Sequence, residues 1–289
     1  MTKPFTTGKN FALKELLSAS SIRLARGIGV HDALGGRIAE RFGFEFLWLS
    51  GLEVSTAFGL PDASLITMTE LLQVASIVVR STKLPLLADC DTGFGGVINV
   101  RRLISECERI GVSGVCLEDK KFPKANSFYD TPQTLESAEL SAEKIAVAVG
   151  VRNDPNFVVV ARTESFIAGE SVSEAIRRVR LYLDAGADAI FVHSRAKAMN
   201  ELVAFFSEFG KLAPVILSPT TYWQATEPEL RALGAVAVLY SNVGMRLAAK
   251  AMIDGVGILS ENGSLAAVEP FMIPLAELQV LQEVTSWLP

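Results

Sequence analysis

The feature that most constrains this chain is an eightfold alternation of short apolar runs with longer amphipathic stretches. The apolar runs have the length of buried β-strands, and each is followed by a turn or by polar residues. The predicted strands span residues 27–30, 44–49, 84–88, 114–117, 156–161, 187–192, 213–217 and 235–239. The predicted helices span residues 34–41, 69–81, 100–110, 138–149, 173–185, 198–209, 228–232 and 245–254. Regular alternation of this kind is typical of a parallel sheet covered by helices.

The chain length agrees with one large domain. It has 289 residues, and about 250 residues are typical of a (β/α)8 barrel. The hydrophobic content of 49% suits a parallel sheet that is buried on both faces. We therefore predict a single (β/α)8 TIM barrel over residues 1–289, with a doubly wound open sheet as the alternative.

Two segments lie outside the alternation. A leading helix is predicted over residues 10–17. After residue 254 the pattern changes to turns at 261–264 and 268–270, followed by an amphipathic helix over 275–287. We predict that residues 255–289 form a C-terminal helical extension, which either packs on its own barrel or crosses to a neighbouring subunit.

Charge and cysteine content exclude several kinds of partner. The net charge of −5 and the lack of any basic run argue against nucleic-acid binding, although a small anionic substrate needs only a few local cations. No apolar run reaches the roughly 18 residues of a membrane span, and residues 1–20 contain no export signal.

The three cysteines form no CxxC pair and fall in or beside apolar elements. Buried, reduced thiols in a cytoplasmic protein are expected.

Every predicted strand ends on polar residues. In a barrel, the carboxyl ends of all strands meet at one face, where active sites are found. We expect the following residues to converge there: Ser50, Asp89, Asp91, Glu118, Arg162, Glu164, His193, Ser218 and Asn242.

Three of these residues, Asp89, Asp91 and Glu118, suggest a metal site. Oxygen ligands without a nearby histidine or cysteine suit Mg²⁺, or Mn²⁺ in its place. The alternative is structural: Asp91 caps the following turn and Glu118 pairs with a lysine.

Arg162 and His193 suggest an anion-binding pair, since a guanidinium binds phosphoryl or carboxylate groups through two parallel hydrogen bonds. For Arg162 the alternative is an ion pair with Glu164. The segment 120–130, here called the mouth loop, contains three lysines and is long enough to close over a ligand. An ordinary solvated loop is the alternative.

The sequence EDKKFPKANS at residues 118–127 resembles the EDKxxxxxNS signature of phosphoenolpyruvate mutases, members of the isocitrate lyase superfamily. The resemblance covers most of the chain. Four further segments are similar to the family in order and spacing, at residues 48–62, 89–96, 160–169 and 185–194.

The resemblance implies a (β/α)8 barrel that exchanges its last helix with a neighbour and assembles as a tetramer, a dimer of dimers. It also implies that Asp89 holds Mg²⁺, while Asp62, Asp91 and Glu118 support the waters of the ion. The remaining roles carry over by position: Trp48, Ser50, Gly51 and Leu52 bind the pyruvyl part of the substrate, Arg162 and His193 hold the phosphoryl group, and Lys124, Asn126 and Ser127 lie on the gating loop. Asp62 belongs with the catalytic residues.

The reaction implied is the interconversion of phosphoenolpyruvate and 3-phosphonopyruvate, used in phosphonate biosynthesis. Carbon–carbon lyases of the superfamily carry a cysteine in this loop, and no cysteine lies between Lys120 and Ser127. Phosphonopyruvate hydrolases tend to have threonine at the position of Asn126. The sequence thus favours the mutase over the hydrolase, and both over a lyase acting on a 2-hydroxy diacid. A non-catalytic barrel that binds an anionic metabolite is the remaining alternative, against which the intact Asp89, Glu118, Arg162 and His193 argue.

Overall fold

The computed structural model describes residues 7–18 and 23–288. Eight parallel strands close into a barrel in sequence order, which excludes the open-sheet alternative. The strands are β1 (Ala25–Val30), β2 (Phe46–Leu49), β3 (Leu86–Asp89), β4 (Gly114–Glu118), β5 (Val158–Thr163), β6 (Ala189–Val192), β7 (Val215–Leu217) and β8 (Ala237–Tyr240). Closure is visible at β1, where Gly27 is in register with both Phe46 of β2 and Leu239 of β8. The predicted TIM barrel is confirmed.

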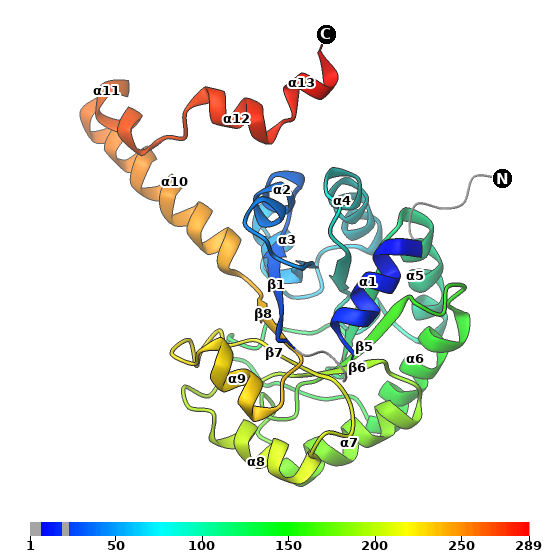
Figure 1. The fold of residues 1–289 in the computed structure, drawn as a ribbon. Coiled ribbons are helices and arrows are strands. Elements are labelled where there is room, and N and C mark those ends of the chain that lie inside the picture. Colours follow the sequence, from blue (N-terminus) through cyan, green and yellow to red (C-terminus); the bar gives the residue numbers. More distant parts are fainter. Residues whose placement is uncertain (1–6, 19–22, 289) are drawn as a thin grey trace, which may run out of the picture.

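Helices surround the barrel (Figure 1). They are α2 (Ala33–Arg41), α3 (Gly51–Ala57), α4 (Met68–Ser81), α5 (Val97–Ile110), α6 (Ala138–Val151), α7 (Val172–Asp184), α8 (Asn200–Phe209) and α9 (Glu227–Leu233). Seven of the eight predicted helices have counterparts here. The helix α3 was not predicted. A capping signal was available in the sequence, because the Ser50 hydroxyl accepts a hydrogen bond from the Glu53 amide at 3.3 Å and caps the start of the helix.

The core has two layers because side chains on a strand alternate between the two faces. One layer lies between the sheet and the helices. The other fills the barrel with residues such as Phe46, Trp48 and Phe191. Gly27 makes room for this filling, since a Cβ atom there would lie 2.2 Å from the Phe46 ring.

The leading helix is α1 (Thr7–Leu16), and its Leu13 joins the barrel filling, as does Leu17 just after it. The predicted helix at 10–17 is therefore confirmed with shifted ends. Residues 1–6 and 19–20 of the segment predicted to lack an export signal lie outside the described residues, as do residues 21–22. Within the described residues, no helix is both long and apolar enough to cross a membrane.

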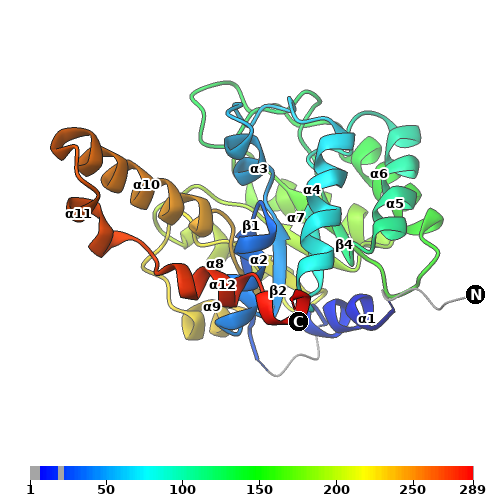
Figure 2. The same cartoon turned by 90° about the horizontal axis from the view of Figure 1, so that it is seen from above.

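The C-terminal segment projects from the barrel (Figures 1 and 2). Its first helix, α10 (Val243–Asn262), continues past the predicted end at 254 and stops at Gly263, which has a positive φ of 61°. The division into barrel and extension at residue 255 thus stays a prediction. A short helix α11 (Leu265–Val268) and a 3-10 turn η1 (Glu269–Phe271) follow.

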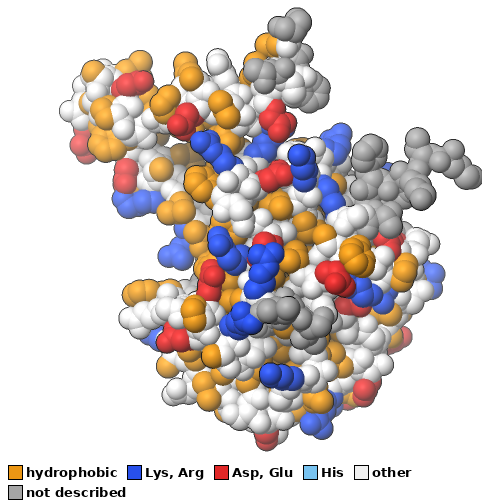
Figure 3. Space-filling model, viewed as in Figure 1, with side chains coloured by type: hydrophobic (Ala, Val, Ile, Leu, Met, Phe, Trp, Pro, Cys, Tyr) orange, Lys and Arg blue, Asp and Glu red, His pale blue; other side chains and the backbone are white. Residues whose placement is uncertain are grey.

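The helix predicted over 275–287 is interrupted. It forms α12 (Leu275–Leu281) and α13 (Val284–Trp287), separated by Glu283 with a positive φ of 54°. The chain returns to its own barrel here, because Arg37 of α2 donates to the Leu281 carbonyl at 2.6 Å. The C-terminal segment from α10 to α12 exposes many apolar side chains (Figure 3). They include Leu247, Ile253, Val256, Phe271 and Leu275, each more than 60% exposed.

All three cysteines, Cys90, Cys107 and Cys116, are buried free thiols. Burial raises the pKa of both Cys90 and Cys116 well above the ordinary thiol value. This agrees with the buried, reduced thiols predicted from the sequence.

Candidate active site

The register of the barrel places the predicted site residues in one layer. Cys116 of β4 fills the barrel, so Glu118, two residues further on, points the same way one step nearer the mouth. Glu118 is in register with Arg162, and Asp89 with Cys116. The same alternation carries Phe191 in the filling to His193 at the mouth. Residues far apart in the sequence therefore meet at the carboxyl ends of the strands.

A small cavity of about 50 Å³ lies among these side chains. Its lining includes the predicted Trp48, Ser50, Leu52, Asp62, Asp89, Glu118, Lys124, Asn126, Ser127, Arg162 and His193, together with Ser218 and Asn242. Asp91 and Gly51 line the adjoining space beside Asp89. The structure thus brings together every site residue predicted from the sequence. A larger groove of about 1000 Å³ lies outside the barrel along α4 and α5, and none of these residues lines it.

Four carboxylates gather on one side of the cavity: Asp62, Asp89, Asp91 and Glu118, here called the carboxylate cluster. Burial raises the pKa of Asp89 to about 6 and that of Asp91 to about 7, and the neighbouring carboxylates add to both shifts. Lys124 is the cation among them, with Nζ 2.6 Å from Asp62 Oδ1 and 3.2 Å from Asp91 Oδ1. Burial opposes its charge, but the four carboxylates together raise the pKa of Lys124 above its ordinary value.

The carboxylate cluster fits a hard divalent cation. Glu118 Oε1 is buried and has no hydrogen-bond partner among the described residues, which is costly for a carboxylate oxygen unless a cation or water meets it. Gly51 leaves the adjoining space open, because a Cβ atom there would lie 3.3 Å from Asp91 Oδ1 and 3.4 Å from Asp89 Oδ2. All the donors are oxygens, as Mg²⁺ prefers.

In the part of the chain that the structure describes, no three His, Cys, Asp or Glu side chains form a ready-made metal cage. An ion held by few direct ligands and several waters agrees with this spacing, as is usual for Mg²⁺. The assignment of Asp89, Asp91 and Glu118 to a metal stays a prediction. In the alternative interpretation Asp91 has a capping role. Asp91 does not cap the next helix, because the N-cap residue of α5 is Gly96.

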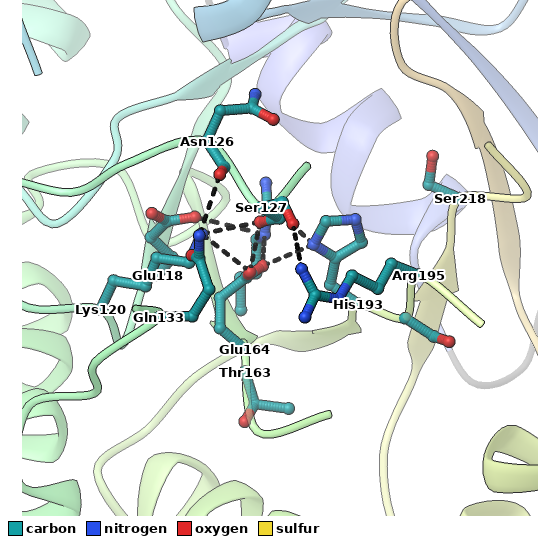
Figure 4. A network of polar contacts seen from close by, with 12 residues as sticks. Glu118, Lys120, Asn126, Ser127, Gln133, Thr163, Glu164, His193, Arg195 and Ser218 are labelled. Carbon is teal, nitrogen blue, oxygen red and sulfur yellow. Dashed lines mark hydrogen bonds and ion pairs between the residues drawn. The ribbon is translucent and has the colours of Figure 1, made fainter. Parts of the chain in front are cut away.

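A second group of charged side chains, with two cations to one carboxylate, adjoins the carboxylate cluster. Arg162, Lys120 and His193 surround the single carboxylate of Glu164, and with Ser127 they are here called the Glu164 cluster. Figure 4 shows Glu164 with Lys120, Ser127 and His193. Arg162 Nε lies 2.5 Å from Glu164 Oε1 and 3.5 Å from Glu118 Oε2. The ion pair considered as an alternative for Arg162 therefore exists, and it leaves Arg162 on the cavity wall. Its guanidinium also lies 5.0 Å from the centre of the Phe191 ring.

The mouth loop is closed over the cavity. Lys124 and Asn126 both donate to Asp62, each at 2.6 Å, and the Asp62 amide donates to the Tyr129 hydroxyl at 3.0 Å. The Lys124 amide also donates to Ser64 Oγ at 3.0 Å. Lys124 and Asn126 are buried. The solvated-loop alternative therefore does not describe residues 124–127, although Lys121 and Phe122 are exposed.

Sequence reasoning missed part of the site. It placed Glu164 among the strand-end residues at the mouth and named it as a possible partner of Arg162, but gave it no role in the site, and it placed Lys120 in the loop. Both residues are buried in one polar cluster. The spacing of two residues between Arg162 and Glu164, which puts both side chains on one face of the strand end, was the signal available for Glu164. Phe128, Phe191, Thr220 and Ser241 line the cavity without having been predicted.

Comparison with known proteins agrees with this geometry. Residues 13–258 match the family model described as phosphoenolpyruvate phosphomutase. The chain is 37% identical to a phosphoenolpyruvate phosphomutase of Tetrahymena pyriformis, over 96% of this chain and 92% of that protein. It is also 37% identical to a phosphonopyruvate hydrolase of Variovorax sp. strain Pal2, over 95% and 94% of the two chains.

Two solved structures have the same fold over nearly the whole chain. A phosphoenolpyruvate phosphomutase from Streptomyces platensis subsp. rosaceus superimposes with a TM-score of 0.93 at 38% identity, covering 96% of both chains. A phosphonopyruvate hydrolase in complex with oxalate and Mg²⁺ superimposes with a TM-score of 0.90 at 36% identity, again covering 96% of both. With its closed parallel barrel and its matching sequence, this chain belongs to the phosphoenolpyruvate mutase family of the isocitrate lyase superfamily.

Proposed function

We propose that this protein is a Mg²⁺-dependent phosphoenolpyruvate mutase, which interconverts phosphoenolpyruvate and 3-phosphonopyruvate. The reaction moves a PO₃ group between C3 and the enol oxygen of pyruvate. One carbon–phosphorus bond and one oxygen–phosphorus bond exchange, with no net uptake of water or of a proton. The site must therefore hold the migrating group and keep water away from it.

The observation that carries the proposal is the closed mouth loop. It buries Lys124, Asn126 and Ser127 against the barrel and leaves a cavity of only about 50 Å³. A sealed site of this kind protects a PO₃ group from hydrolysis during transfer. The Asn126 side chain, bonded to Asp62, forms part of this seal.

The two sides of the cavity complement the two ends of the substrate. Arg162 and His193 would hold the phosphoryl group, and Trp48, Ser50, Gly51 and Leu52 would bind the pyruvyl end. Mg²⁺ at the carboxylate cluster would stabilise the negative charge of the pyruvyl enolate; Mn²⁺ could replace it. Lys124 and Asn126 would keep Asp62 turned toward the cavity while the loop is closed.

Phosphonopyruvate hydrolase is the second candidate, because the hydrolase from Variovorax is as similar to this chain as the Tetrahymena mutase. That reaction yields pyruvate and phosphate, so it requires a water molecule beside the phosphorus and a proton for C3. Asn126 supports the mutase, since the sequence resemblance associates threonine with hydrolases at this position.

Phosphorus NMR of the protein with phosphonopyruvate and Mg²⁺ tests the proposal. Conversion of the phosphonate signal into that of phosphoenolpyruvate is expected, and a chelator should stop it. Inorganic phosphate as the first product would establish the hydrolase instead. Absence of any conversion would contradict both and direct attention to 2-hydroxy diacids.

We also propose a cytoplasmic homo-tetramer, a dimer of dimers in which neighbours exchange the C-terminal helices. The exposed apolar side chains of α10 to α12 support exchange, because a large apolar surface usually packs against a partner. In the exchanged assembly, the contact between Arg37 and the Leu281 carbonyl would form between neighbouring chains instead of within one chain. Light scattering of the purified protein should give four times the mass of one chain. A monomer at micromolar concentration would contradict the assembly.

A further inference from the structure

The strongest unassigned feature of the site is the carboxylate of Glu164. It is fully buried and follows directly on β5, two residues after Arg162. Its backbone is fixed from behind, since the Glu164 amide donates to Asp119 Oδ1 at 2.8 Å. Asp119 in turn accepts a hydrogen bond from the Tyr182 hydroxyl at 2.7 Å. The Glu164 side chain therefore extends from a rigid anchor.

The two oxygens of this carboxylate serve different parts of the molecule. Oε1 faces the barrel wall, where it meets Arg162 Nε at 2.5 Å and His193 Nδ1 at 2.7 Å. Oε2 faces the mouth loop, where it accepts from Ser127 Oγ at 2.7 Å and lies 3.2 Å from Lys120 Nζ. Figure 4 shows Glu164 between Lys120, Ser127 and His193. One rigid group thus connects the loop with both residues expected to hold the phosphoryl group.

The loop side of this connection depends on closure. Lys120 Nζ donates both to Ser127 Oγ at 2.7 Å and to the Ala125 carbonyl at 2.9 Å, so it orders the same turn that presents Ser127. Arg195 donates to the Ser127 carbonyl at 3.1 Å. Lys120 lies at the start of the loop and is anchored by a β-bridge to Leu135. Movement of residues 121–130 away from the barrel would therefore remove Ser127 from Glu164 and leave Oε2 with Lys120 alone.

The charges favour a fixed, ionised Glu164. Burial would raise the pKa of Glu164, but Arg162, His193 and Lys120 hold it well below the ordinary value for a glutamate. Burial lowers the pKa of His193. His193 Nδ1 lies 2.7 Å from Glu164 Oε1 and 2.8 Å from Arg162 Nη2, so the carboxylate and the guanidinium together fix the orientation of the ring. The loop also contacts this ring directly, because Phe128 packs edge-on against His193 with centroids 6.0 Å apart.

We propose that Glu164 is a positioning residue that couples closure of the mouth loop to the placement of Arg162 and His193. A closed loop supplies Ser127 to Oε2, which holds the carboxylate plane so that Oε1 aligns both phosphoryl-holding side chains. The inference rests on the proposed function for the identity of the substrate, but the link between loop and barrel does not depend on which phosphoryl reaction occurs.

The test combines Glu164→Gln and Ser127→Ala with two readouts. Trypsin cleavage after the exposed Lys121 reports loop opening, and kcat and KM for phosphonopyruvate report the site. Each single variant should cleave about tenfold faster than the wild-type protein, and Glu164→Gln should lower kcat about 100-fold, as expected for loss of charge-assisted hydrogen bonds. The double variant should be little worse than Glu164→Gln alone, because both changes remove the same connection.

Ser165→Ala is the matched control. Ser165 is a buried serine next to Glu164, and its hydroxyl bonds to Thr163 Oγ1 at 2.7 Å and not to the loop. This variant should change the melting temperature without changing the cleavage rate. Glu164→Asp, which keeps the charge on a shorter side chain, should partly restore kcat relative to Glu164→Gln.

The proposal is overturned if folded Glu164→Gln is cleaved at the wild-type rate, or if the effects of the two substitutions on kcat simply multiply. Failure of the proposed function has a different signature. In that case the wild-type protein would convert no phosphonopyruvate, while the cleavage rates would still show whether Glu164 holds the loop.

Discussion

The carboxylate cluster and the Glu164 cluster are both largely buried but opposite in their balance of charge. The first places four carboxylates around Lys124, whereas the second places Arg162, Lys120 and His193 around one carboxylate. Buried charges are tolerated only when they are compensated. The first cluster therefore lacks positive charge and the second lacks negative charge. A divalent cation and a doubly anionic substrate, bound together, would compensate both.

Removing a carboxylate from the first cluster should have the largest effect. Asp89→Ala is expected to reduce turnover by at least about 1000-fold, since positioned charge stabilisation is the largest contribution in such sites. Mg²⁺ stimulation should be lost at the same time. Kinetics over a Mg²⁺ titration measure both effects, with the exposed Asp184→Ala as control. Retained Mg²⁺ stimulation would refute the metal assignment.

Changing the cation of the second cluster without changing its charge should have the next largest effect. Arg162→Lys keeps a positive charge but loses the planar guanidinium, whose Nε donates to Glu164 and whose Nη2 meets His193. We expect kcat/KM to fall about 100-fold while Mg²⁺ affinity changes little. A parallel loss of Mg²⁺ affinity would mean that the two sides of the cavity do not act separately.

Asn126 belongs to the loop but bonds to the first cluster, so it tests whether closure matters there. Asn126→Ala removes the 2.6 Å hydrogen bond to Asp62 and should lower turnover about tenfold, with little change in melting temperature. Asn126→Thr should additionally raise the yield of inorganic phosphate. An unaffected rate in both variants would remove the loop amide from the mechanism.

The smallest effect is expected for the ion pair between His31 and Glu53, which contains one positive and one negative group. His31 Nδ1 lies 2.7 Å from the buried Glu53 Oε2, and this hydrogen bond raises the pKa of His31. The hydrogen bond stabilises the folded protein fully below the pKa of His31 in the unfolded chain, about 6.5. This stabilisation is lost as pH rises through the higher pKa of His31 in the folded protein. The melting temperature should thus fall by a few degrees between pH 6 and pH 9, as is typical for about 1 kcal/mol.

His31→Gln should flatten this part of the pH profile. Mg²⁺ and substrate should not change this pH dependence, because the charges of His31 and Glu53 already compensate each other without a ligand. A ligand-dependent shift in the titration of His31 would show that charge balance does not separate this pair from the two clusters.

The sequence was sufficient for the barrel and for the position of the site. Apolar runs that end on polar residues specify both, since parallel strands align their carboxyl ends; the prediction for Asp89, Glu118, Arg162 and His193 depended on nothing else. The resemblance added Asp62 and Trp48, which no strand-end pattern would assign.

Other features could not be predicted because they depend on contacts between distant segments. The two carboxylate oxygens of Glu164 have different partners, Arg162 and Ser127, only when the loop lies against β5. The break at Glu283 accompanies the contact of Arg37 with Leu281, residues 244 positions apart. By contrast, α3 was missed although a local signal existed, because Ser50 and Gly51 were interpreted as a strand end and as substrate-binding residues and not as the start of a helix.

The buried cysteines have a practical consequence for observing the mouth loop. With Cys90, Cys107 and Cys116 all inaccessible, alkylating dyes should react slowly with the native protein. A cysteine introduced at the exposed Phe122 would then be labelled selectively. A fluorophore there would follow opening and closing of the loop in real time, in a chain that keeps all its natural thiols.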